Sequence, residues 1–277
     1  DIIVLKNNKG TEDNRVRKLD YSIQISKLFY QRFMNNQDIT LFSPHEVPGL
    51  YEAFGTEHFD EMYEKYERAH SVPKKKIGAQ DLFMSLLKER AETGRMYIMN
   101  RDHCNTHSSF FEDEAKISMS NLCQEITLPT KPLQSFDDRD GEIALCILSA
   151  INVGQLTSDL KDLPELCDLA VRSLDEVIDY QEYPVEAARL STVNRRSLGI
   201  GYIGLAHFLA KNKLKYDDKE AHKLVHRLSE HFQYNLIKTS VELAKEKGSC
   251  GYVSQTKYHG GLLPIDHYKK DVDEIVK

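Results

Sequence analysis

The stretch that most constrains the fold is residues 143–150, which read IALCILSA and are apolar on both faces. Parallel strands that are covered on both sides have near-continuous apolar runs of this kind, and such strands occur in α/β proteins. A buried helical segment gives the same pattern over so short a length. We therefore expect an α/β protein in which this run is a covered parallel strand, with Cys146 near its middle.

Length and charge exclude several classes of protein. The 277 residues are 40% hydrophobic and 29% charged, which is typical of one large or two ordinary globular domains. The net charge of −6 argues against polynucleotide binding, which needs a basic surface. The sequence contains neither an apolar run of the roughly 20 residues that cross a bilayer nor a signal-peptide pattern. We expect a cytoplasmic protein that binds neither membranes nor polynucleotides.

Helical and strand patterns divide the rest of the chain. We expect helices at about 58–70, 79–91, 163–180 and 218–247, the last with a break, and strands at 39–42 and 96–99. Leu169 and Val177 are expected to face inward on the 163–180 helix, and Cys167 to belong to its packing. The lysine-rich residues 72–76 predict a solvated loop rather than a phosphate site.

The five cysteines are too scattered for a disulfide scaffold, and no CxxC pair indicates zinc. Residues 102–108, DHCNTHS, place two histidines and a cysteine close together. A tetrahedral metal site needs a further ligand, and the sequence shows none at a distance. We therefore expect a hydrogen-bonded loop here and no metal.

Two further patterns are expected to carry no chemistry. Residues 199–204, GIGYIG, match a dinucleotide-binding fingerprint, but that fingerprint needs a buried strand before it, and residues 191–197 are polar. Close packing of a helix against a strand is favoured over a nicotinamide site. Residues His222 and His226 share one face of a predicted helix, nearly opposite its leucines, so we expect this pair toward solvent. His231 lies on a different face, and a solvated or packing role is favoured over a ligand role for these histidines.

Residues 119–129, MSNLCQEITLP, hold the candidate chemistry. If they are extended, Asn121, Cys123 and Glu125 share one face, and Cys123 lies roughly 7 Å from Glu125. An ionised Glu125 at that distance disfavours a thiolate by roughly 2 kcal/mol, so Cys123 should stay a thiol. The face then favours one-electron or proton chemistry over thiolate attack. The alternative is a buried strand in which the cysteine is a small apolar residue.

These residues and others in the same order resemble the catalytic large subunit of class I ribonucleotide reductases of the aerobic bacterial and bacteriophage type. The resemblance extends over nearly the whole chain. It is carried by residues 5–8, 41–44, 47–51, 102–108, 121–126, 141–146, 196–201 and 263–266.

The resemblance implies a role for each candidate residue. Cys123 would become a thiyl radical and remove the 3′ hydrogen of a ribonucleotide, and Glu125 would take the 3′-hydroxyl proton. Asn121 would hydrogen-bond the ribose hydroxyls, with Leu122 also lining the substrate site. Cys146 would be one of two thiols that supply the reducing electrons and end as a disulfide.

The resemblance also implies a fold and a set of partners. Residues 1–277 would be the central segment of a ten-stranded α/β barrel, built from two five-stranded halves, with the radical cysteine on an inner loop. Ribonucleoside diphosphate would be the substrate and thioredoxin or glutaredoxin the reductant. The segment would bind no cofactor itself, and the radical would come from a metal-containing small subunit.

The segments of the family that bind nucleotide effectors, carry the second redox cysteine and relay the radical have no match in this sequence. We therefore expect the polypeptide alone to be inactive, and active only within a complete large subunit or with chains that supply the rest. The alternatives are a truncated, non-catalytic fragment or interaction module, and a nicotinamide-dependent oxidoreductase that rests on residues 199–204 alone.

Overall fold

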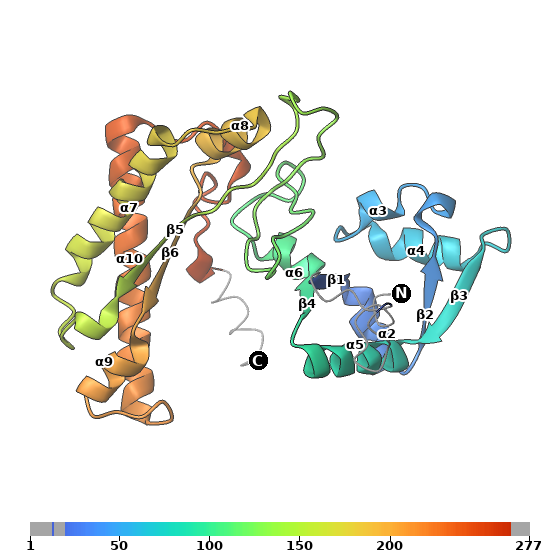
Figure 1. The fold of residues 1–277 in the computed structure, drawn as a ribbon, viewed down its shortest axis with the longest axis horizontal. Coiled ribbons are helices and arrows are strands. Elements are labelled where there is room, and N and C mark those ends of the chain that lie inside the picture. Colours follow the sequence, from blue (N-terminus) through green and yellow to red (C-terminus); the bar gives the residue numbers. More distant parts are fainter. Residues whose placement is uncertain (1–12, 14–19, 267–277) are drawn as a thin grey trace. The chain divides into compact units, whose positions relative to one another are not determined.

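The computed structural model describes residue 13 and residues 20–266. These residues form two compact units (Figure 1). The first unit takes in the described residues up to Pro129 together with those from Gly261 onward, and the second unit is Thr130–Gly260. The resembling motif at residues 5–8 lies outside the described residues. None of the helices in the described part is long and apolar enough to cross a membrane.

The first unit is built around two separate strand pairs. Strand β1 (Tyr21–Ile25) runs parallel to β4 (Met96–Asn100), and β2 (Asp38–Phe42) runs antiparallel to β3 (Lys74–Gly78). The helices of this unit are α2 (Lys27–Met34), α3 (Leu50–Ala53), α4 (Phe59–Arg68), α5 (Ala79–Thr93) and α6 (Arg101–Thr106), with a 3₁₀ turn η2 (Pro44–Glu46). Helix α5 ends at Thr93 because the next residue, Gly94, has a φ of 66°, in the left-handed region that favours glycine.

Two expectations for the first unit are wrong. The lysine-rich connector is not a loop, because Lys74–Gly78 forms strand β3 along β2. The lysine side chains are in solvent, as expected, but Lys74 Nζ donates to the carbonyls of Glu67 (2.7 Å) and Ala69 (2.6 Å) at the end of α4. Residues 102–108 are likewise not a plain loop, since most of them belong to the short helix α6.

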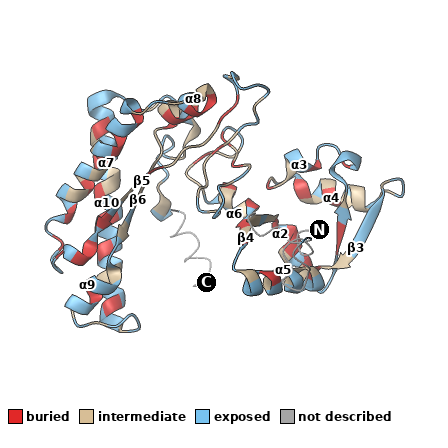
Figure 2. Ribbon diagram, viewed as in Figure 1, coloured by how far each residue is buried: buried red, intermediate tan, exposed pale blue. Residues whose placement is uncertain are grey.

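The second unit packs long helices against one parallel strand pair. Strands β5 (Ile147–Asn152) and β6 (Leu198–Ile203) pair in parallel, with Ile147 opposite Leu198. The helices are α7 (Leu163–Tyr180), α8 (Glu186–Arg195), α9 (Leu205–Lys211) and α10 (Lys219–Lys247), with 3₁₀ turns η3 (Val153–Gln155) and η4 (Val253–Gln255). Figure 1 shows α7 and α10 side by side, and Figure 2 shows buried residues along both.

The core of the second unit confirms some expectations and corrects others. Cys167 is fully buried in the α7 packing, as expected. Helix α10 is continuous, without the expected break. Leu169 and Val177 are exposed, because Val171, Leu174 and Ile178 make up the inward face of α7 together with Leu163 and Cys167.

The strand expected at residues 143–150 is shifted and only half covered. It begins at Ile147, so Cys146 immediately precedes β5 rather than lying in its middle. Ile147 and Ile151 are buried, whereas Leu148 on the other face is 62% exposed. Helix α7 packs against β5 within the second unit.

The α/β class is confirmed, but the described residues form no closed barrel. Their strands make three separate pairs, of which β1–β4 and β5–β6 are parallel. A barrel requires every strand to hydrogen-bond on both edges, and each of these strands bonds one described neighbour.

Candidate active site

Cys123 lies in a tight turn rather than in the extended strand expected for residues 119–129. The Gln124 backbone N–H donates to the Asn121 carbonyl (3.2 Å), and Gln124 has a positive φ of 65°. This left-handed position breaks the two-residue alternation that an extended strand would have. The expected line of Asn121, Cys123 and Glu125 on one strand face is therefore wrong, and the three are instead neighbours around a turn.

The turn forms because two polar side chains bond to its backbone. Asn121 Oδ1 accepts from the Ile126 N–H (3.2 Å), and Ser120 Oγ donates to the Ile126 carbonyl (2.7 Å). Asparagine and serine side chains compete with strand ladders in this way. The two bonds close a small loop with Cys123 inside it.

The closed loop presents its tip to solvent. Asn121, Leu122, Cys123 and Glu125 are all exposed on this segment. The Ile126 N–H can only donate, so the atom of the Asn121 amide that faces it must be the acceptor Oδ1. Within the described residues, Asn121 Nδ2 has no hydrogen-bond partner, so it is available to donate to a ligand.

Helix α6 holds the segment that enters this loop. Asn105, which is 1% exposed, donates from Nδ2 to the Ile117 carbonyl (3.1 Å) and accepts from the Ile117 N–H at Oδ1 (2.8 Å). Arg101, also 1% exposed, donates to the Ser118 carbonyl, which accepts from Gln24 Nε2 as well. No sequence pattern predicts this clamp, although Asn105 belongs to the polar DHCNTHS motif.

One tyrosine that no sequence pattern indicated is affected by the Cys123 side chain. Hydrogen bonding with Cys123, followed by the charge of its thiolate, raises the pKa of Tyr97, on β4. The phenol therefore stays protonated, and able to donate, throughout the neutral pH range.

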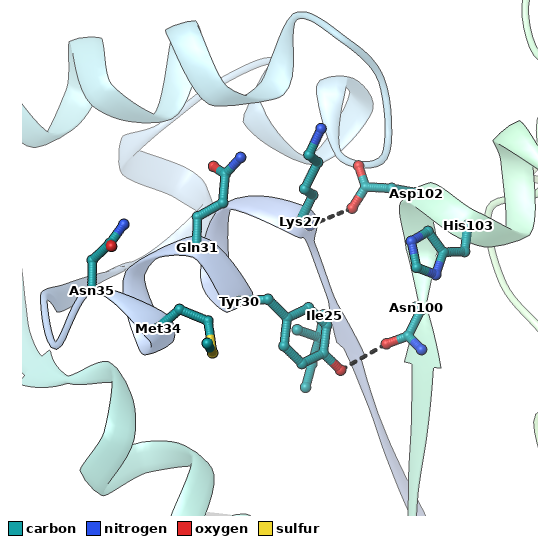
Figure 3. Close-up of a pocket in the computed structure, with 9 residues that line it drawn as sticks. All are labelled: Ile25, Lys27, Tyr30, Gln31, Met34, Asn35, Asn100, Asp102 and His103. Atoms are coloured by element: carbon teal, nitrogen blue, oxygen red, sulfur yellow. Dashed lines mark hydrogen bonds between the residues drawn. The ribbon is translucent and has the colours of Figure 1, made fainter. Parts of the chain in front are cut away.

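Two cavities lie next to the carboxyl end of β4. One, of about 350 Å³, is lined by β4 and α6 together with Gln124 and Thr127 from the Cys123 loop and its exit. The other, of about 430 Å³, lies between α2 and the start of α6 (Figure 3). In it, Tyr30 Oη donates to Asn100 Oδ1 (2.7 Å) and the Lys27 N–H donates to Asp102 Oδ2 (2.6 Å). Cys123 itself lines neither of these two cavities.

Within residues 102–108 the two histidines are exposed, and the cysteine packs against the core. His103 and His107 are one turn apart on α6 with ring centroids 5.4 Å apart, and Cys104 packs against the small cluster that includes Met99 and Ile117. Burial raises the pKa of the Cys104 thiol. Among the described residues, no three His, Cys, Asp or Glu side chains converge in a way that could hold a metal ion.

Cys146 belongs to the second unit, whereas Asn121, Cys123 and Glu125 belong to the first. It is half-buried at the entrance to β5, where a Cβ added to Gly199 would lie 3.3 Å from its sulfur. The glycine on β6 therefore leaves the space that the Cys146 side chain occupies. The convergence of Cys146 and Cys123 on one cavity stays a prediction.

A buried ion pair fixes the segment just before Cys146. Glu142 Oε2 accepts from Arg195 Nη2 (2.5 Å), and the two side chains are 5% and 3% exposed. Lys131 Nζ lies 3.0 Å from the other carboxylate oxygen, and Arg195 also donates to Gln255 Oε1 (2.9 Å). The pair ties together the loop at 131–141, α8 and the segment around η4.

The second unit also contains Cys167, Cys250, residues 199–204 and the histidines of α10. All five cysteines lie among the described residues and all are thiols. Burial raises the pKa of Cys167 to about 11, and burial also raises the pKa of Cys250, so neither is a reactive thiol. Residues 199–203 are strand β6 itself, which leaves no phosphate-binding loop, and His222, His226 and His231 are exposed.

Comparison with known proteins gives one family. The family model described as "ribonucleotide reductase, barrel domain" matches residues 1–276. The curated alpha subunit of ribonucleoside-diphosphate reductase from Buchnera aphidicola of Schizaphis graminum is 57% identical over 276 residues, which are 99% of this chain and 36% of that protein. The subunits from Escherichia coli K12 (reductase 1) and phage T4 are 52% and 44% identical over 99% of the chain. The chain spans about a third of the length of these relatives.

Proposed function

This chain belongs to the ribonucleotide reductase family, and from that premise we propose that residues 1–277 are the central segment of the catalytic barrel of a large subunit. The complete subunit would reduce ribonucleoside diphosphates to deoxyribonucleotides by thiyl-radical chemistry. The observation that carries the proposal is the Cys123 turn, because it presents a thiol, a carboxylate and a side-chain amide together on a backbone that side-chain hydrogen bonds hold in place.

Each side chain of the turn has one task in this reaction. The Cys123 thiyl radical takes the hydrogen atom from C3′ of the ribose, and Glu125 accepts the proton of the 3′-hydroxyl. Asn121 donates from Nδ2 to a ribose hydroxyl, since its Oδ1 is already used by the Ile126 N–H. Leu122, which is 57% exposed, lies next to the same substrate.

Cys146 supplies reducing electrons. It and a second thiol from the rest of the large subunit each give one electron and one proton, the ribose loses its 2′-hydroxyl as water, and the two sulfurs end as a disulfide. A dithiol reductant of the thioredoxin or glutaredoxin type restores the thiols. The place of Cys146 beside Gly199 favours this task, because a half-buried thiol at a strand end is held in position yet reachable.

The proposal also assigns tasks to the rest of the large subunit and to the small subunit. The β1–β4 and β5–β6 pairs would belong to a ten-stranded barrel whose remaining strands the rest of the subunit supplies, with Cys123 on a loop inside it. The radical would come from a metal-containing small subunit, and nucleotide effectors would bind outside this segment. The protein would act in the cytoplasm, in the synthesis of deoxyribonucleotides for DNA replication.

The test uses the complete large subunit with its small subunit, a dithiol reductant and a ribonucleoside diphosphate tritiated at C3′. Cys123→Ser should lose both tritium release and deoxynucleotide formation, because an alcohol hydroxyl forms no comparable radical. Cys146→Ser should still release tritium but form no product in steady state. Cys250→Ser serves as the control and should retain activity. Deoxynucleotide formation by the Cys123→Ser protein would refute the proposal.

A further inference from the structure

We propose that Arg196 is a positioning residue for Cys146: its side chain binds helix α7 and holds the turn between α8 and β6, so that β6 begins where it supports the Cys146 sulfur. This inference rests on the proposed function, since it takes the task of Cys146 to be the supply of reducing electrons. It adds a residue from a distant part of the chain to that chemistry.

The backbone of Arg196 adopts a conformation that its residue type disfavours. Arg196 directly follows α8 with a φ of 49° and a ψ of 45°, in the left-handed region. Its N–H donates to the Thr192 carbonyl (2.8 Å) and closes the last turn of the helix. Glycine is the usual residue at such a position, because a side chain crowds the backbone there. An arginine persists in this conformation only when its side-chain contacts outweigh the cost.

The Arg196 side chain makes these contacts with α7. Its Nε donates to Asp175 Oδ1 (2.6 Å), and its Nη2 donates to the Asp175 carbonyl (2.8 Å). Nη1 and Nη2 also donate to the two carboxylate oxygens of Asp179, one helical turn later (2.9 and 2.8 Å). A planar guanidinium forms paired bonds of this kind, which an ammonium group does not reproduce. The side chain therefore fixes the turn after α8 against two successive turns of α7.

The turn fixed in this way sets where β6 begins. Leu198 is the first residue of β6, and it lies opposite Ile147 of β5. The next residue, Gly199, lies beside Cys146, since a Cβ added to the glycine would be 3.3 Å from the Cys146 sulfur. A shift of the turn at Arg196 would move the start of β6 with it. The wall next to the sulfur would then open.

The residue before Arg196 holds the Cys146 segment from another side. The Arg195 side chain donates to the buried carboxylate of Glu142, in the segment that leads into Cys146. Two adjacent arginines therefore bind different parts of the unit, one the segment before Cys146 and the other helix α7. Through this one turn, both the approach to the cysteine and the strand beside it are fixed.

Loss of the Arg196 side chain should act locally rather than unfold the unit. The buried Asp175 keeps a cation, because Lys247 Nζ lies 3.1 Å from its Oδ2. The Asp179 side chain is 53% exposed and can be hydrated instead. A hydrogen bond between charged groups corresponds to roughly a tenfold shift in a local opening equilibrium. The expected result is a looser surrounding of Cys146 in a folded protein.

The first experiment measures how fast Cys146 is alkylated in the reduced, complete large subunit. Arg196→Gly allows the left-handed backbone but removes the guanidinium, so it separates the side-chain contacts from the backbone conformation. We expect Cys146 to react roughly tenfold faster, while Cys104, a half-buried thiol of the first unit, keeps its rate. Arg189→Ala is the control, because it removes an ion pair with Glu186 within α8 and should leave both rates unchanged.

Two results of this experiment would overturn the inference. One is an unchanged rate at Cys146 in the Arg196→Gly protein, which would show that the guanidinium does not hold the strand beside the sulfur. The other is an equal acceleration at Cys146 and Cys104, which would show a general loss of stability instead of a local one.

The second experiment changes the partner on α7. Asp179→Ala leaves Arg196 bonded to Asp175, so alkylation of Cys146 should rise only about threefold. The contact with Asp179 is already absent in Arg196→Gly, so adding Asp179→Ala to that variant should change the rate no further. Independent, additive effects of the two substitutions would overturn the inference.

Activity separates this inference from the proposed function. In the tritium assay described above, Arg196→Gly should lower deoxynucleotide formation about fivefold relative to tritium release, because the affected step is the one that uses Cys146. Equal losses of both would overturn the inference. A Cys146→Ser protein that still forms deoxynucleotide in steady state refutes the proposed function. An inactive Cys146→Ser protein, together with unchanged alkylation of Cys146 in Arg196→Gly, refutes only this inference.

Discussion

The two units hold their candidate cysteines in different ways. In the first unit, Cys123 is on an irregular turn whose backbone is bonded by the side chains of Ser120 and Asn121, and Asn105 bonds the segment that leads into it. In the second unit, Cys146 adjoins a strand, so the β5–β6 ladder and the glycine at position 199 place it. A segment without a ladder needs polar side chains to satisfy its backbone groups, whereas a strand end takes its position from regular pairing.

This difference has a chemical counterpart. The proposed radical cysteine is exposed on the segment at the tip of a loop, where a substrate can reach it. The proposed reducing cysteine is half-buried, as suits a thiol that meets one partner and is shielded from others. Mutations that loosen the Cys123 turn should therefore slow hydrogen-atom abstraction, whereas mutations that displace Cys146 should slow the reduction step.

The largest effect is expected at the buried ion pair of the second unit. Glu142→Gln leaves Arg195 buried without its carboxylate, and breaking a buried pair from one side costs about 3–5 kcal/mol. Amide hydrogen exchange of residues 130–146 in the complete large subunit should rise accordingly. Glu220→Gln, which breaks an exposed pair with Lys223, should change protection by less than about 0.5 kcal/mol. Equal effects of the two variants would show that the Glu142 pair does not hold the segment before Cys146.

The next largest effect is expected at the clamp of the first unit. Asn105→Ala leaves the N–H and carbonyl of Ile117 buried without their partners, at a cost of about 2–4 kcal/mol. Amide hydrogen exchange should rise over residues 117–127. Tritium release from C3′ should fall more than in Glu142→Gln, which weakens the second unit. Asn212→Ala is the control, since the Asn212 side chain donates to the Phe208 carbonyl of the helix that it follows (2.8 Å). Unchanged tritium release would contradict the assigned role of the clamp.

A pH-dependent effect is expected at Glu67 in the first unit. The hydrogen bond from Arg32 is the main cause that lowers the pKa of Glu67 to about 2. A depressed pKa stabilises the fold above the ordinary glutamate pKa, and this stability is lost as the pH falls from about 4.5 toward 2. Glu67→Gln should therefore cost up to about 3 kcal/mol at pH 7 and very little near pH 2. Urea unfolding of the wild type and Glu67→Gln between pH 7 and pH 2 measures the difference in the free energy of unfolding. A difference that does not depend on pH would contradict the lowered pKa of Glu67.

The smallest effect is expected at the glycine beside Cys146. A methyl group at position 199 would lie 2.5 Å from Leu148 Cδ2 and 3.3 Å from Cys146 Sγ, so both must shift. Gly199→Ala should cost about 1 kcal/mol and slow the reduction step more than tritium release. Gly201→Ala on the same strand meets nothing within 4 Å and should be neutral. If both variants behave alike, close packing does not place Cys146.

The sequence predicted the regular elements better than the site. Helix α7 begins and ends at the residues that the spacing of its apolar side chains predicts. Helix α5 extends two residues past its predicted end, as far as the residue before Gly94. Strand β3 was missed because its lysines face solvent while its backbone pairs with β2. The turn at Cys123 was missed because its cause is a side chain, Asn121, that bonds a backbone group five residues away.

The candidate residues were predicted through the family resemblance, which the comparisons confirm at the level of the family. Their spacing alone indicated a strand, and the bonds between Asn105 and Ile117 join α6 to a segment further along the chain. Such a contact depends on how α6 and that segment pack, and periodicity carries no information about it.

The central claim is that Cys123 and Cys146 act on the same nucleotide, and single-turnover chemistry tests it most directly. The complete large subunit, reduced and freed of external reductant, is mixed with small subunit and ribonucleoside diphosphate, then quenched and analysed by mass spectrometry for the state of each cysteine. The account predicts that Cys146 becomes a disulfide in proportion to deoxynucleotide formed, that Cys123 returns to a thiol, and that Cys123→Ser abolishes the oxidation of Cys146. A Cys146 that remains a thiol after one turnover, or that is oxidised equally without Cys123, would contradict it.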